Sequence, residues 1–135
     1  MSDELDKNTV FESMRILQEN TICFDCGQGK PSRASVAHSS FICITCASQH
    51  RGLGVNLSGV KSLTRDEWND TQLRQLLIGG NDKLREYFAK YGLNEVKEIK
   101  LKYITMAAQY YRRRNKAIAL GEPFGQAELS FKEGR

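Results

Sequence analysis

The sequence predicts an α+β fold in which a small three-stranded antiparallel sheet is flanked by about five to six helices. Three observations support this fold class. The chain has 135 residues, the length of a single domain. Short β-prone segments lie in its first half, and amphipathic helical patterns occupy most of the rest. Four cysteines form two C-x2-C pairs, a framework that can hold a metal beside a small sheet.

The composition is that of an ordinary globular protein. Hydrophobic residues make up 40% and charged residues 27% of the chain, which excludes a disordered tail, a collagen-like repeat and a membrane-embedded domain. The formal net charge of +4 is too small to indicate nucleic acid by itself. The acidic residues 1–6 lack the apolar segment of a secretory signal, so we expect the protein in the cytoplasm.

The first expected element is an amphipathic helix. The sequence Thr9-Val10-Phe11-Glu12 has the form of a capping box at its start, and Asn20 would end it. The apolar residues expected to face the core are Val10, Phe11, Met14, Leu17 and Ile22.

The four cysteines come next, as the pairs Cys23 with Cys26 and Cys43 with Cys46, separated by sixteen residues. Two such pairs can supply four thiolates to one tetrahedral Zn²⁺. Two disulfides are the alternative, but thiols persist in a reducing compartment. A redox pair would leave the other two cysteines unused, and a catalytic zinc would need an open coordination position. The spacing therefore predicts one structural zinc ion, with His38 and His50 not required as ligands.

Short β-prone segments surround the second pair. Residues 35–37 and 41–42 read as a hairpin, and residues 60–63 as a third strand. A short helix is expected over 47–51, because the glycines that follow would stop it.

The second half of the chain reads as helices. A second capping box at 64–67 predicts a helix that ends at Gly79-Gly80-Asn81, which would cap a further helix ended by Gly92. A single long helix is expected over 96–120. We place the domain at 1–122 and expect 123–135 to be a C-terminal tail of a longer protein. The side chains expected in the core are Trp68, Leu73, Leu76, Leu77, Leu84, Tyr87, Phe88, Tyr103, Tyr110 and Tyr111.

Arg51 lies five residues after the last cysteine, beside two glycines that permit close approach of another surface. A guanidinium offers five donors and is always charged, so a rigidly held arginine suits the phosphate oxygens of a partner. The alternative is an internal ion pair with Asp66 or Glu67 that only stabilises the fold. Spacing alone leaves both open.

The pattern C-x2-C-x16-C-x2-C-x4-R, continued by residues 52–58, resembles the catalytic domain of Arf GTPase-activating proteins. Further matches are residues 60–64, Asp66, Trp68 and 79–81. The resemblance covers roughly residues 8 to 122. Residues 101–103 and 107–108 are most similar to the Golgi, coat-associated subgroup.

This resemblance implies the zinc-finger-containing Arf GAP fold, one structural Zn²⁺ on the four cysteines, and Arg51 as the arginine finger. The implied partner is an Arf-family small GTPase in its GTP form, which brings nucleotide, Mg²⁺ and the water-positioning glutamine. The chain would thus activate an enzyme rather than be one. A finger supplied in trans is worth about 10³–10⁵ in kcat, or about 4–7 kcal/mol. A coat complex is a second expected partner, with recruitment to Golgi membranes and a role in ER–Golgi vesicle and protein transport.

Residues near the finger are candidates for contact with the partner, although packing is the alternative for two of them, Ile44 and Leu53. The chain departs from the family where a tryptophan usually follows the loop proline, because Arg33 stands there, and where Ser39 replaces a usual glycine. Arg33 would either weaken activity or add its own charge at the Arf surface. The candidates are Arg33, Ile44, His50, Leu53, Lys61 and Asp66.

Two other functions compete with this interpretation. A nucleic-acid-binding zinc module would carry basic residues just behind the second cysteine pair, whereas residues 52–59 are uncharged, so we expect no nucleic acid. A scaffold that binds Arf without stimulating it is motivated by Arg33. The run Arg112–Arg114 reads as a solvated helix face or as a contact with anionic lipid.

Overall fold

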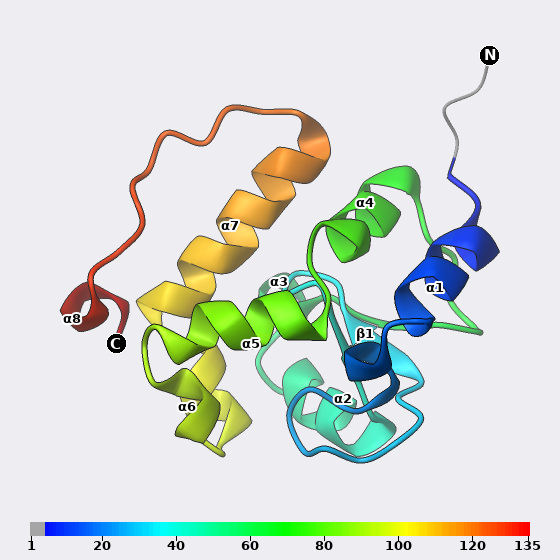
Figure 1. The fold of residues 1–135 in the computed structure, drawn as a ribbon, viewed down its shortest axis with the longest axis horizontal. Coiled ribbons are helices and arrows are strands. Elements are labelled where there is room, and N and C mark those ends of the chain that lie inside the picture. Colours follow the sequence, from blue (N-terminus) through cyan, green and yellow to red (C-terminus); the bar gives the residue numbers. More distant parts are fainter. Residues whose placement is uncertain (1–4) are drawn as a thin grey trace.

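The computed structural model describes residues 5–135, and its centre is a three-stranded antiparallel sheet in the order β2-β1-β3 (Figure 1). The residues in front of position 5, predicted as part of the domain, lie outside the described chain. Ala34, in the middle of β1, lies opposite Phe41 of β2 and Lys61 of β3. The predicted α+β fold with its small antiparallel sheet is confirmed. The strands are β1 (Arg33–Ser35), β2 (Ser40–Ile42) and β3 (Val60–Ser62).

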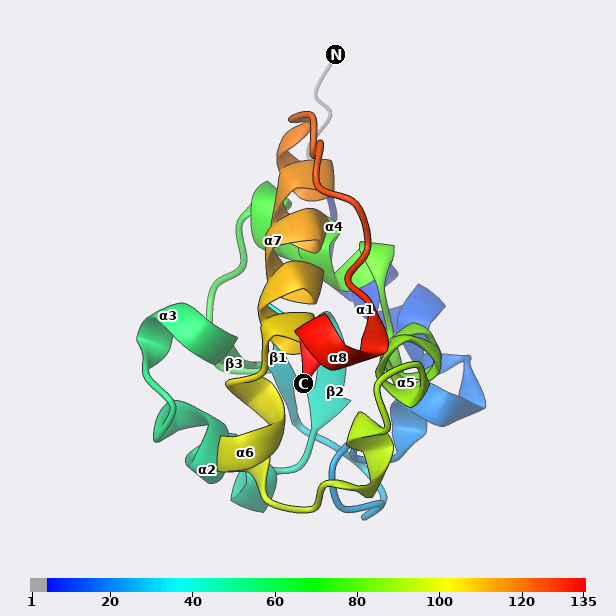
Figure 2. The same cartoon turned by 90° about the vertical axis from the view of Figure 1, so that its left-hand side faces the viewer.

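Helices surround this sheet, and in Figure 2 the long α7 runs lengthwise between α2, α3 and α6 on one side and α1 and α5 on the other. Five helices in the described residues have eight or more residues, namely α1, α2, α4, α5 and α7. No helix in residues 5–135 combines the length and the apolar character needed to cross a membrane. The helices are α1 (Lys7–Arg15), α2 (Ile44–Arg51), α3 (Val55–Ser58), α4 (Asp70–Ile78), α5 (Asn81–Ala89), α6 (Ile99–Tyr103), α7 (Met106–Leu120) and α8 (Phe131–Gly134), with 3₁₀ turns at Gln18–Thr21 and Leu93–Glu95.

Both predicted capping boxes are wrong, because a better-placed side chain caps each helix nearby. The carboxylate of Asp6 caps α1 and accepts hydrogen bonds from the Thr9 amide at 3.2 Å and the Thr9 hydroxyl at 2.7 Å. Asn69 and Gln72 form the capping box of α4. Asp and Asn rank above Thr as N-caps, so the capping preference agrees with the caps that the structure shows.

The predicted helix 96–120 is two helices, separated by Ile104 and Thr105. The hydroxyl of Thr105 accepts a hydrogen bond from the Ala108 amide at 3.2 Å and donates one to the Lys102 carbonyl at 2.9 Å. Threonine competes for backbone groups in this way and is a good N-cap. The break lets α6 turn toward α2, with which it is in contact.

The first strand of the hairpin, β1, lies two residues earlier in the chain than the predicted 35–37. Val36 and Ala37 leave the sheet and donate backbone hydrogen bonds to Gly59 and Ser58, at 3.2 and 3.0 Å. Ser39 closes the turn with φ of 52°, the left-handed region that favours glycine. This is the position where the family resemblance leads one to expect glycine.

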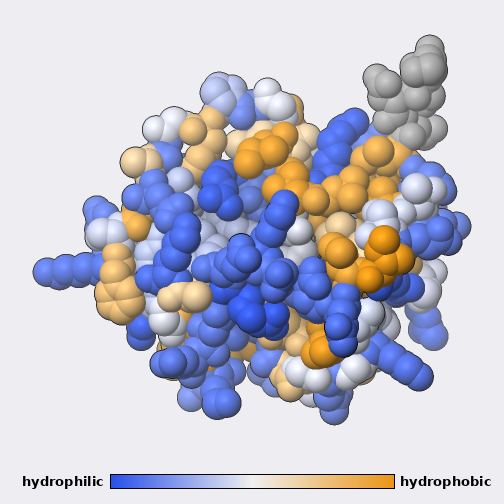
Figure 3. Space-filling model, viewed as in Figure 1, coloured by the Kyte–Doolittle hydropathy of each residue, from blue (hydrophilic) through white to orange (hydrophobic). Residues whose placement is uncertain are grey.

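The core consists of two clusters on either side of the sheet. One gathers around Ile42, Phe88 and Tyr103, and the other around Phe11 and Phe41. Three residues predicted to be inside are instead exposed, because α1 ends at Arg15 and one side of α4 faces solvent. Exposed apolar groups gather over α1 and α4 in Figure 3. The three are Leu17, Ile22 and Leu77, with exposed fractions of 46%, 39% and 38%.

The residues predicted as a C-terminal tail, 123–135, fold back from the end of α7, and α8 packs against α7 (Figure 1). The hydroxyls of Tyr91 and Tyr110 donate to the carbonyls of Leu129 and Gln126, at 2.8 and 3.1 Å. Gly134 lies so close to the Tyr91 ring that a Cβ there would come within 2.4 Å of it. Only glycine therefore fits at this contact.

Candidate functional site

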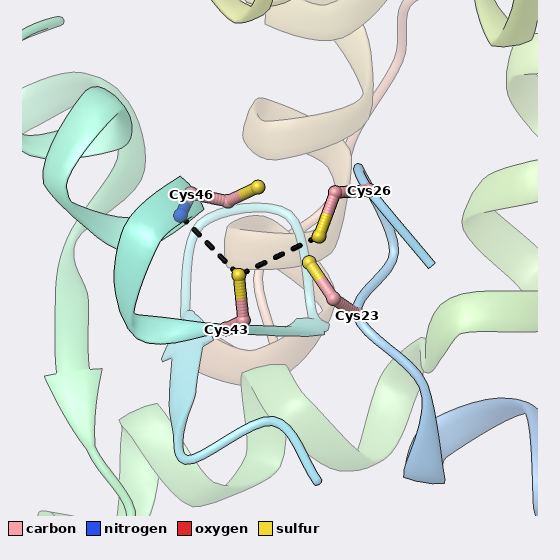
Figure 4. Close-up of side chains that lie close together, drawn as sticks. All are labelled: Cys23, Cys26, Cys43 and Cys46. Carbon is pink, nitrogen blue, oxygen red and sulfur yellow. Dashed lines mark hydrogen bonds between the residues drawn. The ribbon is translucent and has the colours of Figure 1, made fainter. Parts of the chain in front are cut away.

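The four cysteines come together at the start of α2, and their sulfur atoms point toward one another (Figure 4). All four Sγ atoms lie within 4.8 Å of one another, and those of Cys26 and Cys43 are 3.6 Å apart. A tetrahedral ion with metal–sulfur bonds of about 2.3 Å has sulfur–sulfur edges of about 3.8 Å. All four thiols are free rather than paired in disulfides. The cluster therefore fits a single tetrahedral metal ion.

Burial opposes negative charge on these sulfur atoms. Burial, aided by the charge of Cys23, raises the pKa of Cys46, and burial raises the pKa of Cys23 as well. Burial would also raise the pKa of Cys43, but hydrogen bonds from the Cys46 amide and the neighbouring thiols hold it below its usual range. Four thiolates so close together need a positive charge among them, which a divalent ion supplies.

Helix α2 connects this cluster to Arg51. The Cys43 sulfur is the N-cap of α2 and accepts a hydrogen bond from the Cys46 amide at 3.4 Å. Arg51 is the last residue of the helix and is exposed. Within residues 5–135 it forms no ion pair, so the alternative of an internal pair with Asp66 or Glu67 is wrong there. The cysteine cluster and Arg51 thus occupy the two ends of one short helix.

The residue before Arg51 is held in a buried polar network. His50 is fully buried, its Nε2 lies 2.7 Å from a carboxylate oxygen of Asp25, and its Nδ1 lies 2.8 Å from the Ser58 hydroxyl. The other oxygen of Asp25 accepts from Lys102 Nζ at 3.1 Å and from the Tyr103 hydroxyl at 2.8 Å. The last turn of α2 is therefore fixed from the first cysteine loop, from α3 and from α6.

Asp25 is the charged centre of this network. Burial alone would raise the pKa of its carboxyl, but the hydrogen bond from His50 and the charges of His50 and Lys102 outweigh burial and hold the pKa below its usual range. Burial, together with the charge of Asp25, raises the pKa of the Tyr103 hydroxyl well above its usual range. At neutral pH Asp25 is thus a carboxylate that accepts from a tyrosine hydroxyl.

The second histidine continues the network toward α7. His38 Nδ1 lies 2.7 Å from the Ser35 hydroxyl, which is itself 2.6 Å from the Ser58 hydroxyl. A guanidinium nitrogen of Arg112 lies 3.4 Å from His38 Nε2. Burial, together with the charges of His50 and Arg112, lowers the pKa of His38 well below its usual range, so this ring is neutral.

Sequence reasoning missed Asp25 and Lys102. The only local signal for Asp25 is its place inside the first C-x2-C pair, between two cysteines that a shared metal ion would hold together. Lys102 gives no such signal. A lysine in a short helix is ordinarily solvated, whereas Lys102 is only 4% exposed. Its partner lies 77 positions away along the chain.

The predicted partner contacts do not all reach the surface. Ile44 begins α2 and is 58% exposed, whereas Leu53 packs against the core. The side chain of His50 is fully buried and contacts only other residues of this chain.

The other three predicted contacts lie on or beside the sheet. Lys61 Nζ donates to the Glu67 carbonyl at 2.6 Å, and the Asp66 carboxylate accepts from the Ser62 amide at 2.7 Å. Arg33, on β1, donates to the Ser32 hydroxyl at 3.0 Å. Lys61 and Arg51 line two hollows that share the residues Gly59 and Val60.

Known proteins resemble this chain over most of its length. The ArfGap family model, described as "Putative GTPase activating protein for Arf", matches residues 8–119. The "ADP-ribosylation factor GTPase-activating protein 3" of Bos taurus is 41% identical over 112 residues, which cover 82% of this chain and 22% of that protein. The "ADP-ribosylation factor GTPase-activating protein GCS1" of Saccharomyces cerevisiae is 34% identical over 109 residues, covering 81% of this chain and 31% of that protein.

A solved structure agrees with these relatives. The "putative GTPase activating protein for ADP ribosylation factor" from Cryptosporidium parvum superimposes with a TM-score of 0.68 and 32% identity, covering 90% of this chain and 98% of that one. The curated relatives are much longer, since this chain spans 22% of the first and 31% of the second.

Proposed function

The chain belongs to the ArfGap family, and from that premise we propose that it stimulates GTP hydrolysis by an Arf-family small GTPase in its GTP form, with Arg51 as an arginine finger. The observation that carries the proposal is the setting of Arg51. It is exposed at the end of α2, a helix that begins in the cysteine cluster and whose last turn is held by the buried His50. Because the backbone at Arg51 is already fixed, only its side chain has to be ordered when it enters a partner's site.

The chemistry follows from charge. When water attacks the terminal phosphate of GTP, negative charge develops on phosphate oxygens that a small GTPase alone neutralises poorly. Arg51 would lie against these oxygens and donate hydrogen bonds as the charge forms. An arginine delivered in trans is worth about 10³–10⁵ in kcat, or about 4–7 kcal/mol. In this proposal the nucleotide and the attacking water belong to the GTPase, so the chain is an activator rather than an enzyme.

We propose Zn²⁺ as the ion of the cysteine cluster, bound by Cys23, Cys26, Cys43 and Cys46. Four sulfur ligands in a tetrahedron suit zinc and leave no open position, so the ion would be structural. Its contribution would be to fix the first turn of α2 and thereby the direction in which the helix presents Arg51.

For contact with the GTPase, we propose the candidates on this side of the molecule that reach solvent. Ile44 offers an apolar group at the start of α2, and Lys61 and Arg33 offer positive charge on the sheet. Leu53 and Asp66 would support them from within. The proposed coat complex, Golgi recruitment and role in vesicle transport depend on the resemblance of residues 101–103 and 107–108 to the coat-associated subgroup.

The experiment is single-turnover GTP hydrolysis by Arf with wild-type protein, Arg51→Lys and Arg51→Ala. Both variants should lose at least about a thousandfold of the stimulated rate. Zinc content and thermal unfolding should not change, because Arg51 is exposed. Arg15→Ala, which removes an exposed arginine at the end of α1, is the matched control and should retain full stimulation.

Binding to Arf, measured alongside the rate, separates the two candidate functions. Wild-type protein that binds Arf without accelerating hydrolysis would be the scaffold that Arg33 suggested. Normal stimulation by Arg51→Ala would show that another group acts on the phosphates.

A further inference from the structure

Beside the Arg51 surface lies a groove of about 430 Å³ whose charged lining residues are all basic. It is bounded by α7, by β3, by the turn after β1 and by two glutamines of α4. The cations come from two elements that are distant in sequence and converge on one hollow. They are Lys61 on β3 and Arg112, Arg113 and Lys116 on α7.

None of these four positive charges takes part in an ion pair within residues 5–135. Lys61 donates to the carbonyl of Glu67 at 2.6 Å and Arg112 to the carbonyl of Tyr103 at 2.9 Å. A carbonyl orients a cation but does not neutralise it, so the repulsion among the four charges persists.

Arg112 is partly buried and makes two side-chain contacts within the fold. Burial lowers the pKa of its guanidinium. Its nearest ring, that of His38, is neutral and lies 3.4 Å away. Partial removal of a guanidinium from water without an anion costs free energy. An anion in the groove would offset this cost.

We propose that this groove binds a ligand bearing two or more phosphate groups, the chemistry shared by inositol phosphates and by the headgroups of phosphoinositide lipids. Arginine matches phosphate oxygens with paired donors, and the hollow has the size of a small-ligand pocket. A nucleic-acid strand would need a basic stripe, but the next arginine, Arg114, lies over the rings of Tyr87, Tyr110 and Tyr111 instead. The gathering of four cations around one hollow therefore favours a compact polyanion.

The groove adjoins the proposed finger. Gly59 and Val60 line both the groove and the smaller hollow that contains Arg51. If Arg51 acts as proposed on a GTPase, a lipid headgroup in the groove would hold the finger close to the membrane surface. The binding site itself does not depend on that function, and it is tested without a GTPase.

The first test is calorimetric titration of the protein with inositol hexakisphosphate. Arg113→Gln combined with Lys116→Gln removes two exposed charges from the groove and should raise Kd by about tenfold or more. Lys97→Gln combined with Lys100→Gln removes the same charge from exposed positions near α6 and should change Kd by less than about twofold. Amide chemical-shift changes on binding should map to Gly59, Val60 and Lys61.

The second test uses vesicles and distinguishes the sources of the ligand. Phosphatidylcholine vesicles with phosphatidylinositol bisphosphate are compared with vesicles that carry the same charge as phosphatidylserine. Preferential sedimentation with the phosphoinositide, lost in the groove variant, assigns a lipid headgroup. Binding of the soluble inositol phosphate alone assigns a free ligand.

Three results would overturn the proposal: no measurable binding, equal loss in the groove and control variants, or equally tight binding of duplex nucleic acid. A groove variant that binds inositol hexakisphosphate as tightly as the wild-type protein would also overturn it, because the basic residues of the groove would then not hold the anion. Unchanged thermal unfolding of both double variants ensures that a loss of binding is not a loss of fold.

Discussion

The Tyr103 hydroxyl provides the sharpest test of the network behind Arg51, because Tyr103→Phe removes one oxygen and keeps the ring. The ring packs against His38 and His50 at centroid distances of 4.6 and 4.5 Å, and these contacts remain in the variant. What is lost is the hydrogen bond at 2.8 Å to Asp25, whose side chain is 2% exposed. The variant therefore isolates one bond to a buried carboxylate.

The expected magnitude follows from the charge on the acceptor. A hydrogen bond to a charged group contributes about 1.5–3 kcal/mol, and the free energy of unfolding should fall by that amount. With an unfolding entropy of about 2.1 cal/mol/K per residue, this corresponds to a decrease in Tm of about 5–11 °C. Urea unfolding is measured at a fixed concentration of free Zn²⁺, because release of metal would otherwise contribute to the transition.

Tyr87→Phe is the matched control. The Tyr87 hydroxyl donates to the Ala107 carbonyl at the same distance, 2.8 Å, and the residue is likewise buried. Since that acceptor is neutral, the expected loss is about 0.5–1.5 kcal/mol. If Tyr103→Phe costs no more than Tyr87→Phe, Asp25 is not acting as a buried carboxylate, and the charged network is refuted.

Two further predictions concern the metal and the helix junction. Cys46→Ser, or removal of the metal by a chelator, should abolish stimulated GTP hydrolysis and reduce the chemical-shift dispersion of the amide signals of residues 23–51, since metal ligation of this kind is worth about 10–16 kcal/mol. Metal-free protein with native Tm and activity would contradict this prediction. Asn81→Ala should lower the free energy of unfolding by about 3 kcal/mol or more, because its side chain accepts from the Phe41 amide at 2.7 Å and donates to the carbonyls of Glu19 and Ile22 at 3.0 and 2.8 Å. Asn94→Ala is its control in urea unfolding: the exposed Asn94 side chain makes one hydrogen bond, to the Arg85 carbonyl at 2.8 Å, so its loss should cost only about 0.5–1.5 kcal/mol.

The features that sequence predicted well are those set by local chemistry. The cysteine spacing predicted the four-sulfur cluster, and glycines predicted where α2, α4 and α7 end. The helix starts were less predictable, because several residues able to cap a helix lie close together in the sequence. Asp6 and Asn69 cap α1 and α4, in place of the predicted Thr9 and Thr64.

The buried network could not be predicted, because its partners meet only in the folded chain. Asp25 and Lys102 look like solvated charges when each is considered among its neighbours in sequence. Their pairing needs the break between α6 and α7, which depends on a single threonine cap. A continuous helix over 96–120 would have carried Lys102 in another direction.

The run Arg112–Arg114 shows why consecutive charges on a helix should not be treated as one patch. Successive residues of an α-helix differ in direction by about 100°, since a turn contains 3.6 residues. Arg112 therefore reaches His38 and the Tyr103 carbonyl, Arg113 lines the basic groove, and Arg114 lies over tyrosine rings. Arg112 and Arg113 both line the groove, together with Lys116 one turn beyond Arg112, whereas Arg114 does not. A charge-reversal scan across the run should accordingly give three different phenotypes: loss of both stability and anion binding at Arg112, loss of anion binding at Arg113, and unchanged anion binding at Arg114.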